Sequence, residues 1–357
     1  MAPQKQHVVR LEKRPAAKPI PGEDLVYQTA PMPTEEDLAD GEVLVKNVYL
    51  TLDPAMRGWM RDQKSYVPPV KLGAVMRGSS VGQVLASRAK GLAKGDWVNC
   101  NIELGWCEYG IAKGSKLEKL ENTEGVPPSV HLGALGGTGL TAYFGLIEVG
   151  QPKKGDTVVV SAAGGATGSM VCQIAKHIFG CRVVGIAGGA EKCQWLKDEL
   201  GVDEAIDYKF EEGRQFKRDL RKACPKGVDV FFDNVGDWIL NEVLKQINFK
   251  ARVVLCGAIA GYNDTTLRPG PSAYLNLVST SSRMEGFIVL NYADRFKEAK
   301  REIGQWLAEG KIKYQEEVIP GLSEAPRALL KLFGEYGGNR GRLIIDIHAG
   351  AQQTSKL

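Results

Sequence analysis

The sequence predicts an α/β protein of two domains, and three features of its 357 residues point to that class. Short β-like runs separated by Gly, Pro and Asp turns fill the first 130 residues, which is typical of a barrel or sandwich. From about Gly133, apolar strands alternate with helical runs, which indicates a parallel sheet covered on both faces. Of the 42 glycines, ten lie between Gly133 and Gly168, where the two patterns meet.

The elements follow from these patterns. In the first part the expected strands are 42–50, 82–86, 97–101 and 106–111. In the alternating part the expected strands are 156–161, 182–186, 205–207, 228–233, 251–255 and 285–290, and the expected helices are 169–178, 191–200, 213–223, 238–247 and 294–309. Short strands return at 316–319 and 342–347. We therefore expect one domain at 1–133 and 315–357, and a second at 134–314.

Composition excludes several classes of function. The net charge is only +4, with no block of Lys or Arg, which argues against a nucleic-acid partner. No stretch approaches 18 apolar residues, and the first residues lack the apolar region of a secretory signal. The seven cysteines are scattered without a C-x-x-C pair, and the four histidines are far apart. We therefore expect reduced thiols and no metal site.

A glycine-rich loop follows the first strand of the alternating part. Residues 162–168 read Ala-Ala-Gly-Gly-Ala-Thr-Gly, directly before a helical run. Such a loop lets the backbone approach a pyrophosphate, which then lies at the positive end of the helix. The alternative is a tight turn without a ligand, but the strand–loop–helix context favours a dinucleotide site.

The end of the next strand indicates which dinucleotide binds. An NAD site usually has Asp or Glu there, accepting a hydrogen bond from the ribose 2′-OH. This chain has Gly188 and Gly189 instead, and Lys192 follows at the start of the next helix. A lysine without that acid favours the 2′-phosphate of NADPH, although a solvated helix lysine is the simpler alternative.

Several strings together resemble one family across nearly the whole chain. They are LTLDPAMRGWM (50–60), SYVPP (65–69), GLTAYFGL (139–146), SAAGGATGS (161–169), FDNVG (232–236), CGAIAGYN (256–263) and GNRGR (338–342). The sequence resembles the zinc-independent medium-chain dehydrogenase/reductases, in the prostaglandin reductase, alkenal double-bond reductase and curcumin reductase group. The resemblance implies a GroES-like β-barrel domain built from both ends of the chain, plus an inserted Rossmann domain with a doubly wound parallel sheet.

The resemblance also implies a set of NADPH contacts, on positions that match the family's motifs. They are Gly165, Ala166, Thr167, Gly168, Lys192, Tyr208, Asn234, Cys256, Gly257, Ala258, Tyr262, Phe287, Ile288, Val289 and Asn339. Taken alone, Tyr208 could equally be a surface aromatic, and the residues at 287–289 and 339 would be assigned to core or loop.

The family's reaction is the reduction of the carbon–carbon double bond of α,β-unsaturated aldehydes and ketones. A hydride goes to the β-carbon, and the enolate must be stabilised and protonated. We expect Tyr262 to be catalytic, because a phenol can donate to an oxyanion and relay a proton. The alternative is that Tyr262 positions the cofactor ribose and water supplies the proton.

The family's substrate pocket corresponds to Met56, Arg57 and neighbouring loops, with Tyr66 as a further aromatic wall. Ala55 stands where relatives often have tyrosine, which leaves the size and polarity of the substrate open. Arg57 is equally well explained as a structural ion-pair partner, and Tyr66 by packing in a proline-rich loop.

Two other functions stay open on the same scaffold: an NADPH quinone oxidoreductase, and a redox-silent NADPH-binding protein or cyclase. We expect a small-molecule enone or enal substrate, no nucleic-acid or membrane partner, and a homodimer as in relatives.

The final Ser355-Lys356-Leu357 matches a peroxisomal address, and the alternative is a coincidental tail on a cytoplasmic enzyme.

Overall fold

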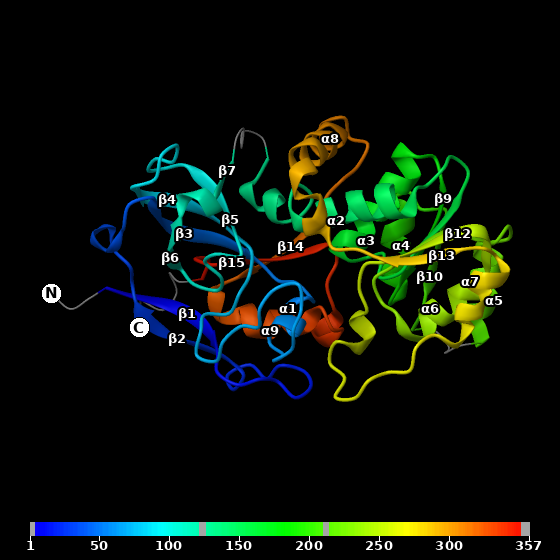
Figure 1. Cartoon of the computed structure of the whole chain (residues 1–357), viewed down its shortest axis with the longest axis horizontal. Helices are drawn as coiled ribbons and strands as arrows, with labels where there is room; N and C mark the ends of the chain where they lie inside the picture. Colours follow the sequence, from blue (N-terminus) through cyan, green and yellow to red (C-terminus); the bar gives the residue numbers. More distant parts are fainter. Residues whose placement is uncertain (1–3, 121–125, 210–213, 351–357) are drawn as a thin grey trace. The chain divides into compact units, whose positions relative to one another are not determined.

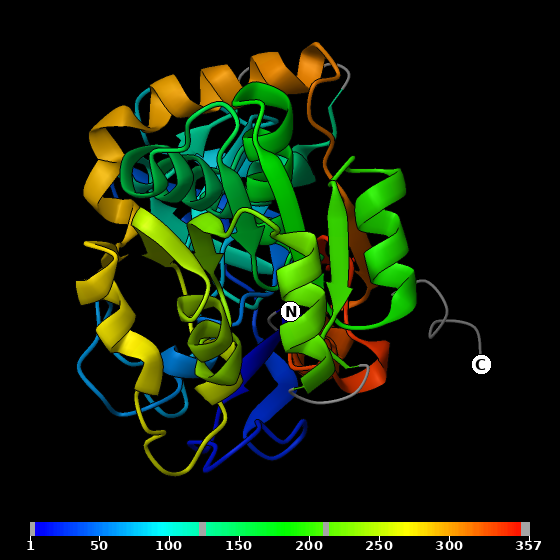
Figure 2. The ribbon, with the colours of Figure 1, turned by 90° about the vertical axis from the view of Figure 1, so that its right-hand side faces the viewer.

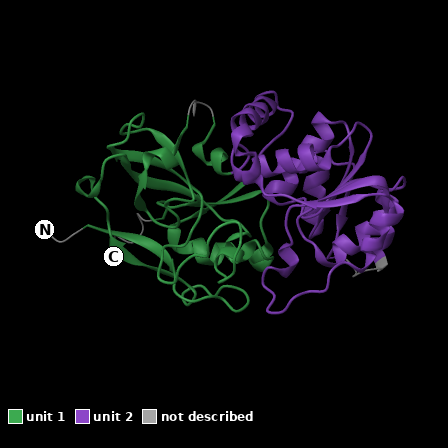
Figure 3. Ribbon diagram, in the orientation of Figure 1, with its two compact units in different colours: residues 1–132, 316–357 green, residues 133–315 purple. Residues whose placement is uncertain are grey.

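The computed structural model describes residues 4–120, 126–209 and 214–350 (Figure 1). The expected peroxisomal tripeptide at 355–357 lies outside these residues. The described chain divides into two compact units, Met1–Leu132 with Glu316–Leu357 and Gly133–Gln315 (Figure 3). Within the described residues, no helix combines the length and the apolar character that crossing a bilayer requires.

Unit 1 is built on antiparallel strands. Its elements are β1 (Lys5–Leu11), β2 (Leu25–Pro31), β3 (Glu42–Thr51), α1 (Met56–Trp59), β4 (Ser80–Ser87), β5 (Trp97–Asn101), β6 (Tyr109–Lys113), β7 (Glu118–Lys119), β14 (Glu316–Pro320), α9 (Ala325–Lys331) and β15 (Arg342–Asp346). β1 pairs with β2, and the larger sheet has the order β14-β15-β3-β4-β5-β7, with β6 also on β3. β15 pairs antiparallel with β3, so the chain's tail completes the sheet that its beginning starts.

Unit 2 is a parallel sheet with helices on both faces. Its elements are α2 (Gly137–Phe144), β8 (Thr157–Val160), α3 (Ala166–Gln173), β9 (Arg182–Ala187), α4 (Ala190–Asp198), β10 (Glu204–Asp207), α5 (Arg214–Ala223), β11 (Val228–Asp233), α6 (Asp237–Leu244), β12 (Ile247–Leu255), α7 (Asn276–Ser279), β13 (Arg283–Gly286) and α8 (Phe296–Ala308). The strand order is β10-β9-β8-β11-β12-β13. This is the doubly wound dinucleotide-binding order, in which the strand order reverses between the parallel neighbours β8 and β11. The predicted fold class is confirmed.

Alternation along the strands decides which helices cover which face. Val184 and Ile186 pack with side chains of α5 and α6 in one core cluster. Gly185 points to the opposite face, where a β-carbon would lie 2.9 Å from Cδ1 of Leu196 in α4. Successive strand residues point to opposite sides, so buried strands of this kind read as continuous apolar runs.

Some expected boundaries were wrong. The strand expected at 285–290 is β13, Arg283–Gly286, because β12 ends at Leu255 and offers no further pairing partner. β12 begins at Ile247, where a helix end was expected, and Lys250 inside it has a positive φ of 63°. An irregular strand of this kind hides the period-2 pattern that sequence reading relies on.

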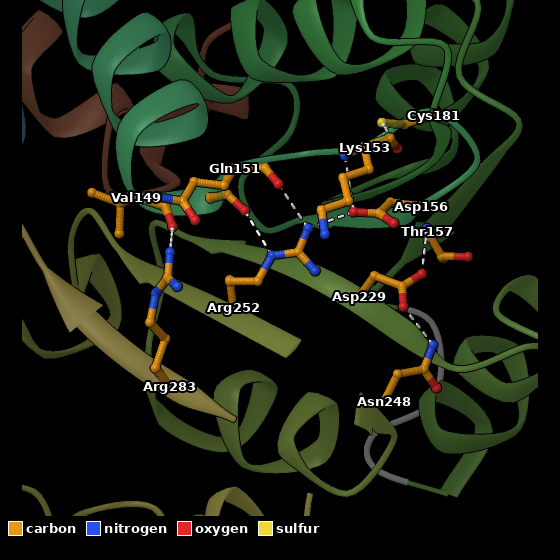
Figure 4. A network of polar contacts seen from close by, with 11 residues as sticks. Val149, Gln151, Lys153, Asp156, Thr157, Cys181, Asp229, Asn248, Arg252 and Arg283 are labelled. Carbon is orange, nitrogen blue, oxygen red and sulfur yellow. Dashed lines mark hydrogen bonds and ion pairs between the residues drawn. The ribbon is translucent and has the colours of Figure 1, made fainter. Parts of the chain in front are cut away.

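A polar network joins the strands at their amino ends (Figure 4). The Arg252 side chain donates to the carbonyls of Gly150 and Gln151, both at 2.9 Å, and pairs with Asp156. Arg283 donates to the Val149 carbonyl at 2.7 Å. These carbonyls end the π-helical turn Gly145–Gly150 that continues α2, and cations stabilise a helix at that end. The network holds the amino ends of the strands together. The loops at their carboxyl ends take no part in it.

Candidate functional site

Four loops meet at the carboxyl edge of the parallel sheet in unit 2. They follow β8, β9, β11 and β12, which are neighbours in the sheet. In open α/β sheets, ligands bind outside this edge at the point where the strand order reverses. Most of the predicted cofactor residues lie in these loops, whereas Met56, Arg57, Tyr66 and Asn339 belong to unit 1.

The loop after β8 forms a tight backbone cradle. Ala162 has a positive φ of 48°, and Gly165 N–H donates to the Ala162 carbonyl at 3.0 Å. α3 begins at Ala166, and a β-carbon on Gly168 would lie only 2.4 Å from the Ala162 carbonyl oxygen. Only glycine fits at 168. The first N–H groups of a helix lack partners within the helix and attract anions.

A buried carboxylate fixes the two central loops. Asp233, at the end of β11, accepts hydrogen bonds from Ser161 Oγ at 2.7 Å and from the N–H groups of Val235 and Gly236 at 3.0 Å. Asn234 Nδ2 donates to the Ser161 carbonyl at 2.7 Å. Burial raises the pKa of Asp233 above its ordinary value. Asn234 therefore ties the β8 loop to the β11 loop.

The loop after β12 is attached to the same carboxylate segment. Cys256 N–H donates to the Asp233 carbonyl at 2.9 Å, and Ile259 N–H to the Asn234 carbonyl at 3.2 Å. Tyr262, at the end of this loop, is half-buried, and Ala258 N–H donates to its phenol oxygen at 3.3 Å. The phenol is thus folded back over Gly257 and Ala258, within the expected cofactor segment. Burial raises the pKa of the Cys256 thiol to about 12, so it stays a neutral thiol.

Lysine and tyrosine side chains cross the glycines of the β8 and β9 loops. A β-carbon on Gly164 would lie 3.4 Å from Cδ of Lys192, so the Lys192 stem passes over the glycine loop. A β-carbon on Gly188 would lie 3.0 Å from Cε1 of Tyr208. Burial, with the charge of Asp207 as a smaller contribution, raises the pKa of Tyr208. The structure therefore brings Lys192 and Tyr208 to the glycine-containing loops.

The predicted segment 287–289 lies just beyond the end of β13. The Phe287 ring meets Phe232 edge to face, with centroids 6.4 Å apart. A β-carbon on Gly145 would lie 2.4 Å from Cζ of Phe287. Ile288 is about one-third exposed, and Val289 begins a short 3₁₀ segment.

In unit 1 the predicted pocket residues have mainly structural contacts. Met56 is fully buried in the core cluster, and Arg57 donates to the carbonyls of Ala17 and Pro15. Tyr66 is half exposed, and its oxygen accepts from Trp59 Nε1 at 3.1 Å. Asn339 Nδ2 donates to the Gly341 carbonyl at 2.9 Å.

Sequence reasoning missed Asp207, Lys209, Ser161 and Asp233. Two of them, Asp207 and Asp233, end parallel strands, and polar residues at the carboxyl ends of strands are a usable signal. Within the part of the chain that the structure describes, no three or more His, Cys, Asp or Glu side chains are grouped to hold a metal ion. All seven cysteines are free thiols.

Comparisons with known proteins place the chain among oxidoreductases. Residues 7–120 match the family model "N-terminal domain of oxidoreductase", and residues 166–305 match "Zinc-binding dehydrogenase". NADPH-dependent curcumin reductase of Escherichia coli is 43% identical, over 97% of this chain and 99% of its own. The NADP(+)-dependent 2-alkenal reductase of Nicotiana tabacum is 39% identical, over 85% and 87%. The crystal structure of CurA with NADPH from Vibrio vulnificus matches with a TM-score of 0.87 and 42% identity, over 97% and 99%.

We predict that Gly168→Ala weakens dinucleotide binding. The added methyl group would meet the Ala162 carbonyl oxygen at 2.4 Å and displace the glycine loop from the start of α3. We expect the Kd for NADPH, measured by fluorescence titration, to rise at least about tenfold, which corresponds to roughly 1.4 kcal/mol. Gly137→Ala is an informative control, because that exposed glycine of α2 has no positive φ and no atom within 4 Å of its β-carbon position. Unchanged NADPH binding by the Gly168 variant would remove this loop from the site.

Proposed function

Because the chain belongs to the zinc-independent medium-chain dehydrogenase/reductases, we propose that it is an NADPH-dependent reductase of α,β-unsaturated aldehydes and ketones. The observation that carries this proposal is the carboxyl edge of the parallel sheet. There the glycine cradle follows β8, Lys192 lies on the helix that follows β9, and Tyr262 follows β12. Curcumin reductase and alkenal reductase among the relatives support reduction of a conjugated double bond.

The residues at this edge fit NADPH. The backbone around Gly165 and the start of α3 would hold the pyrophosphate, where a side chain at Gly168 would fill the cradle. Lys192 would pair with the 2′-phosphate, and Tyr208 would pack beside it. Cys256, Gly257 and Ala258 would lie along the nicotinamide ribose, and Phe287, Ile288 and Val289 would hold the carboxamide.

Bound NADPH supplies the hydride, which is accepted by the β-carbon of the substrate. Electrons then move onto the substrate's carbonyl oxygen, so a donor at that oxygen lowers the barrier. We assign this role to the Tyr262 phenol, which also provides a path for a proton to the α-carbon. The Ala258 N–H group holds the phenol oxygen, and the bonds of Ile259 and Ala260 to the β11 loop hold the segment.

We predict that Tyr262→Phe lowers kcat for an enone by about 100-fold, as expected for loss of an oxyanion donor or general acid. The Kd for NADPH should change less than about threefold, because the ring is kept. Steady-state kinetics with a panel of enals, enones, quinones and ketones, beside NADPH titrations, check both values. Tyr314→Phe, an exposed tyrosine of the same unit outside the proposed association surface, is the matched control. Unchanged turnover would exclude Tyr262, and turnover of quinones without enones would contradict the proposed reaction.

We also propose that two copies associate through the free edge of the parallel sheet. β13 is the last strand of that sheet. The yellow segment that holds α7 and β13 runs along one side of unit 2 (Figure 2). Tyr274, Leu275, Val278 and Leu290 are each more than half exposed. Antiparallel pairing of two β13 strands about Met284 would place Arg283 opposite Glu285 of the second copy, which are opposite charges. An unprotected edge of this kind otherwise promotes aggregation.

The oligomeric state tests this association. Light scattering after gel filtration should give the mass of a dimer for the parent protein. The double variant Leu275→Glu, Val278→Glu should give a monomer with an unchanged circular dichroism spectrum. Leu72→Glu, an exposed leucine in unit 1, should stay dimeric. A monomeric parent protein at tens of micromolar would contradict the proposal.

For localisation, we propose that Ser355-Lys356-Leu357 directs the protein to peroxisomes. A fluorescent protein carrying residues 346–357 at its carboxyl end should form puncta that coincide with a peroxisomal marker in eukaryotic cells. The same fusion without the last three residues should be diffuse. A diffuse signal from both fusions would contradict the assignment.

A further inference from the structure

The turn between β9 and α4 is bordered by a second lysine, from another strand. Lys209 follows the end of β10, and its side chain folds back over Gly188. A β-carbon on Gly188 would lie 2.9 Å from Cε of Lys209. The ammonium nitrogen is one bond beyond that carbon, so it lies next to the turn.

Backbone pairing holds Lys209 in this place. β9 and β10 are parallel, and Ala187 is opposite Asp207, so the residues that follow each strand are brought side by side. The Asp207 Oδ1 atom accepts two hydrogen bonds, one from Gly189 N–H at 2.8 Å and one from Lys209 N–H at 2.9 Å. One carboxylate oxygen thus clamps the β9 turn to the segment that carries Lys209. Among the residues that the structure describes, none forms an ion pair with the Lys209 ammonium group.

The position of this turn defines what the lysine would meet. In dinucleotide-binding sheets, the end of the second strand contacts the ribose 2′ position. That strand is β9 here, and Gly188 and Gly189 follow it without an acid. Lys192, on α4, crosses Gly164 in the loop after the neighbouring strand β8. A phosphate monoester carries close to two negative charges at neutral pH, which two lysines on separate elements would balance.

We propose that Lys209 is a second determinant of the preference for a 2′-phosphorylated cofactor, acting beside Lys192. The inference rests on the proposed NADPH site and adds a residue to its phosphate-binding part. Lys209 donates a charge-assisted hydrogen bond to the 2′-phosphate, and Asp207 acts as a positioning residue that keeps the lysine over Gly188.

The competing role for Lys209 is packing of its aliphatic stem on Gly188, and two substitutions separate the roles. Lys209→Met keeps most of the stem and removes the charge, whereas Lys209→Arg keeps the charge. Lys197→Met is the matched control, since Lys197 is an exposed lysine on α4 that pairs with Glu204 at 3.3 Å. The probes are 2′,5′-ADP and 5′-AMP, which differ only in the 2′-phosphate, titrated into the full-length protein by calorimetry.

We expect Lys209→Met to weaken 2′,5′-ADP binding by about tenfold and to leave 5′-AMP binding within twofold of the parent. Lys209→Arg should retain most of the affinity for 2′,5′-ADP, and Lys197→Met should match the parent. Two results would overturn the proposal in favour of packing. One is an equal loss of affinity for both nucleotides, and the other is unchanged 2′,5′-ADP binding by Lys209→Met. A parent protein that does not prefer 2′,5′-ADP would overturn it as well.

These titrations need no turnover, so they separate this inference from the proposed function. Lys209-dependent binding of 2′,5′-ADP in a protein that reduces no enone would leave the inference standing and contradict the reaction. If the parent protein reduces enones with NADPH and Lys209→Met binds 2′,5′-ADP as tightly as the parent, the reaction stands and the inference about Lys209 is contradicted.

Discussion

Asp233 holds its carboxylate fully buried at the end of β11, where an uncompensated charge would be very costly. Hydrogen bonds from Ser161, Val235 and Gly236 offset that cost. The same bonds hold the β8 and β11 loops together. The Asp233 carbonyl also accepts a hydrogen bond from Cys256 N–H in the β12 loop. The glycine cradle and the Tyr262 segment therefore both depend on one side chain that has no direct part in the proposed chemistry.

The parts of the site that can be predicted from the sequence are those whose contacts join residues close together in the chain. Gly168 stands in a strand–loop–helix string, and its close approach to Ala162 is a contact between near neighbours. The apolar residues 158–160 of β8 and 230–232 of β11 likewise indicate burial on both faces of the sheet. For these elements, period, glycine spacing and turn residues are sufficient, and the fold class follows from them.

Other features depend on pairs far apart in the sequence. Ser161 and Asp233 are 72 residues apart, and they meet because β8 and β11 are neighbours across the point where strand order reverses. Lys209 comes to Gly188 through the register of β9 and β10. The irregular start of β12 is set by its contacts with β11 and by Lys250, not by its own apolar pattern. The pairing register of the strands creates these contacts. That register cannot be predicted from residue spacing within a single segment.

Gly145 connects two regions of unit 2 that the sequence separates by more than a hundred residues. Its missing side chain leaves room for the Phe287 ring, which also packs on Phe232. A single methyl group at 145 would push that ring and, through its backbone, the Ile288 and Val289 segment expected to hold the nicotinamide carboxamide. If the proposed site is correct, side-chain volume at position 145 alone would change the angle at which the nicotinamide ring faces a substrate.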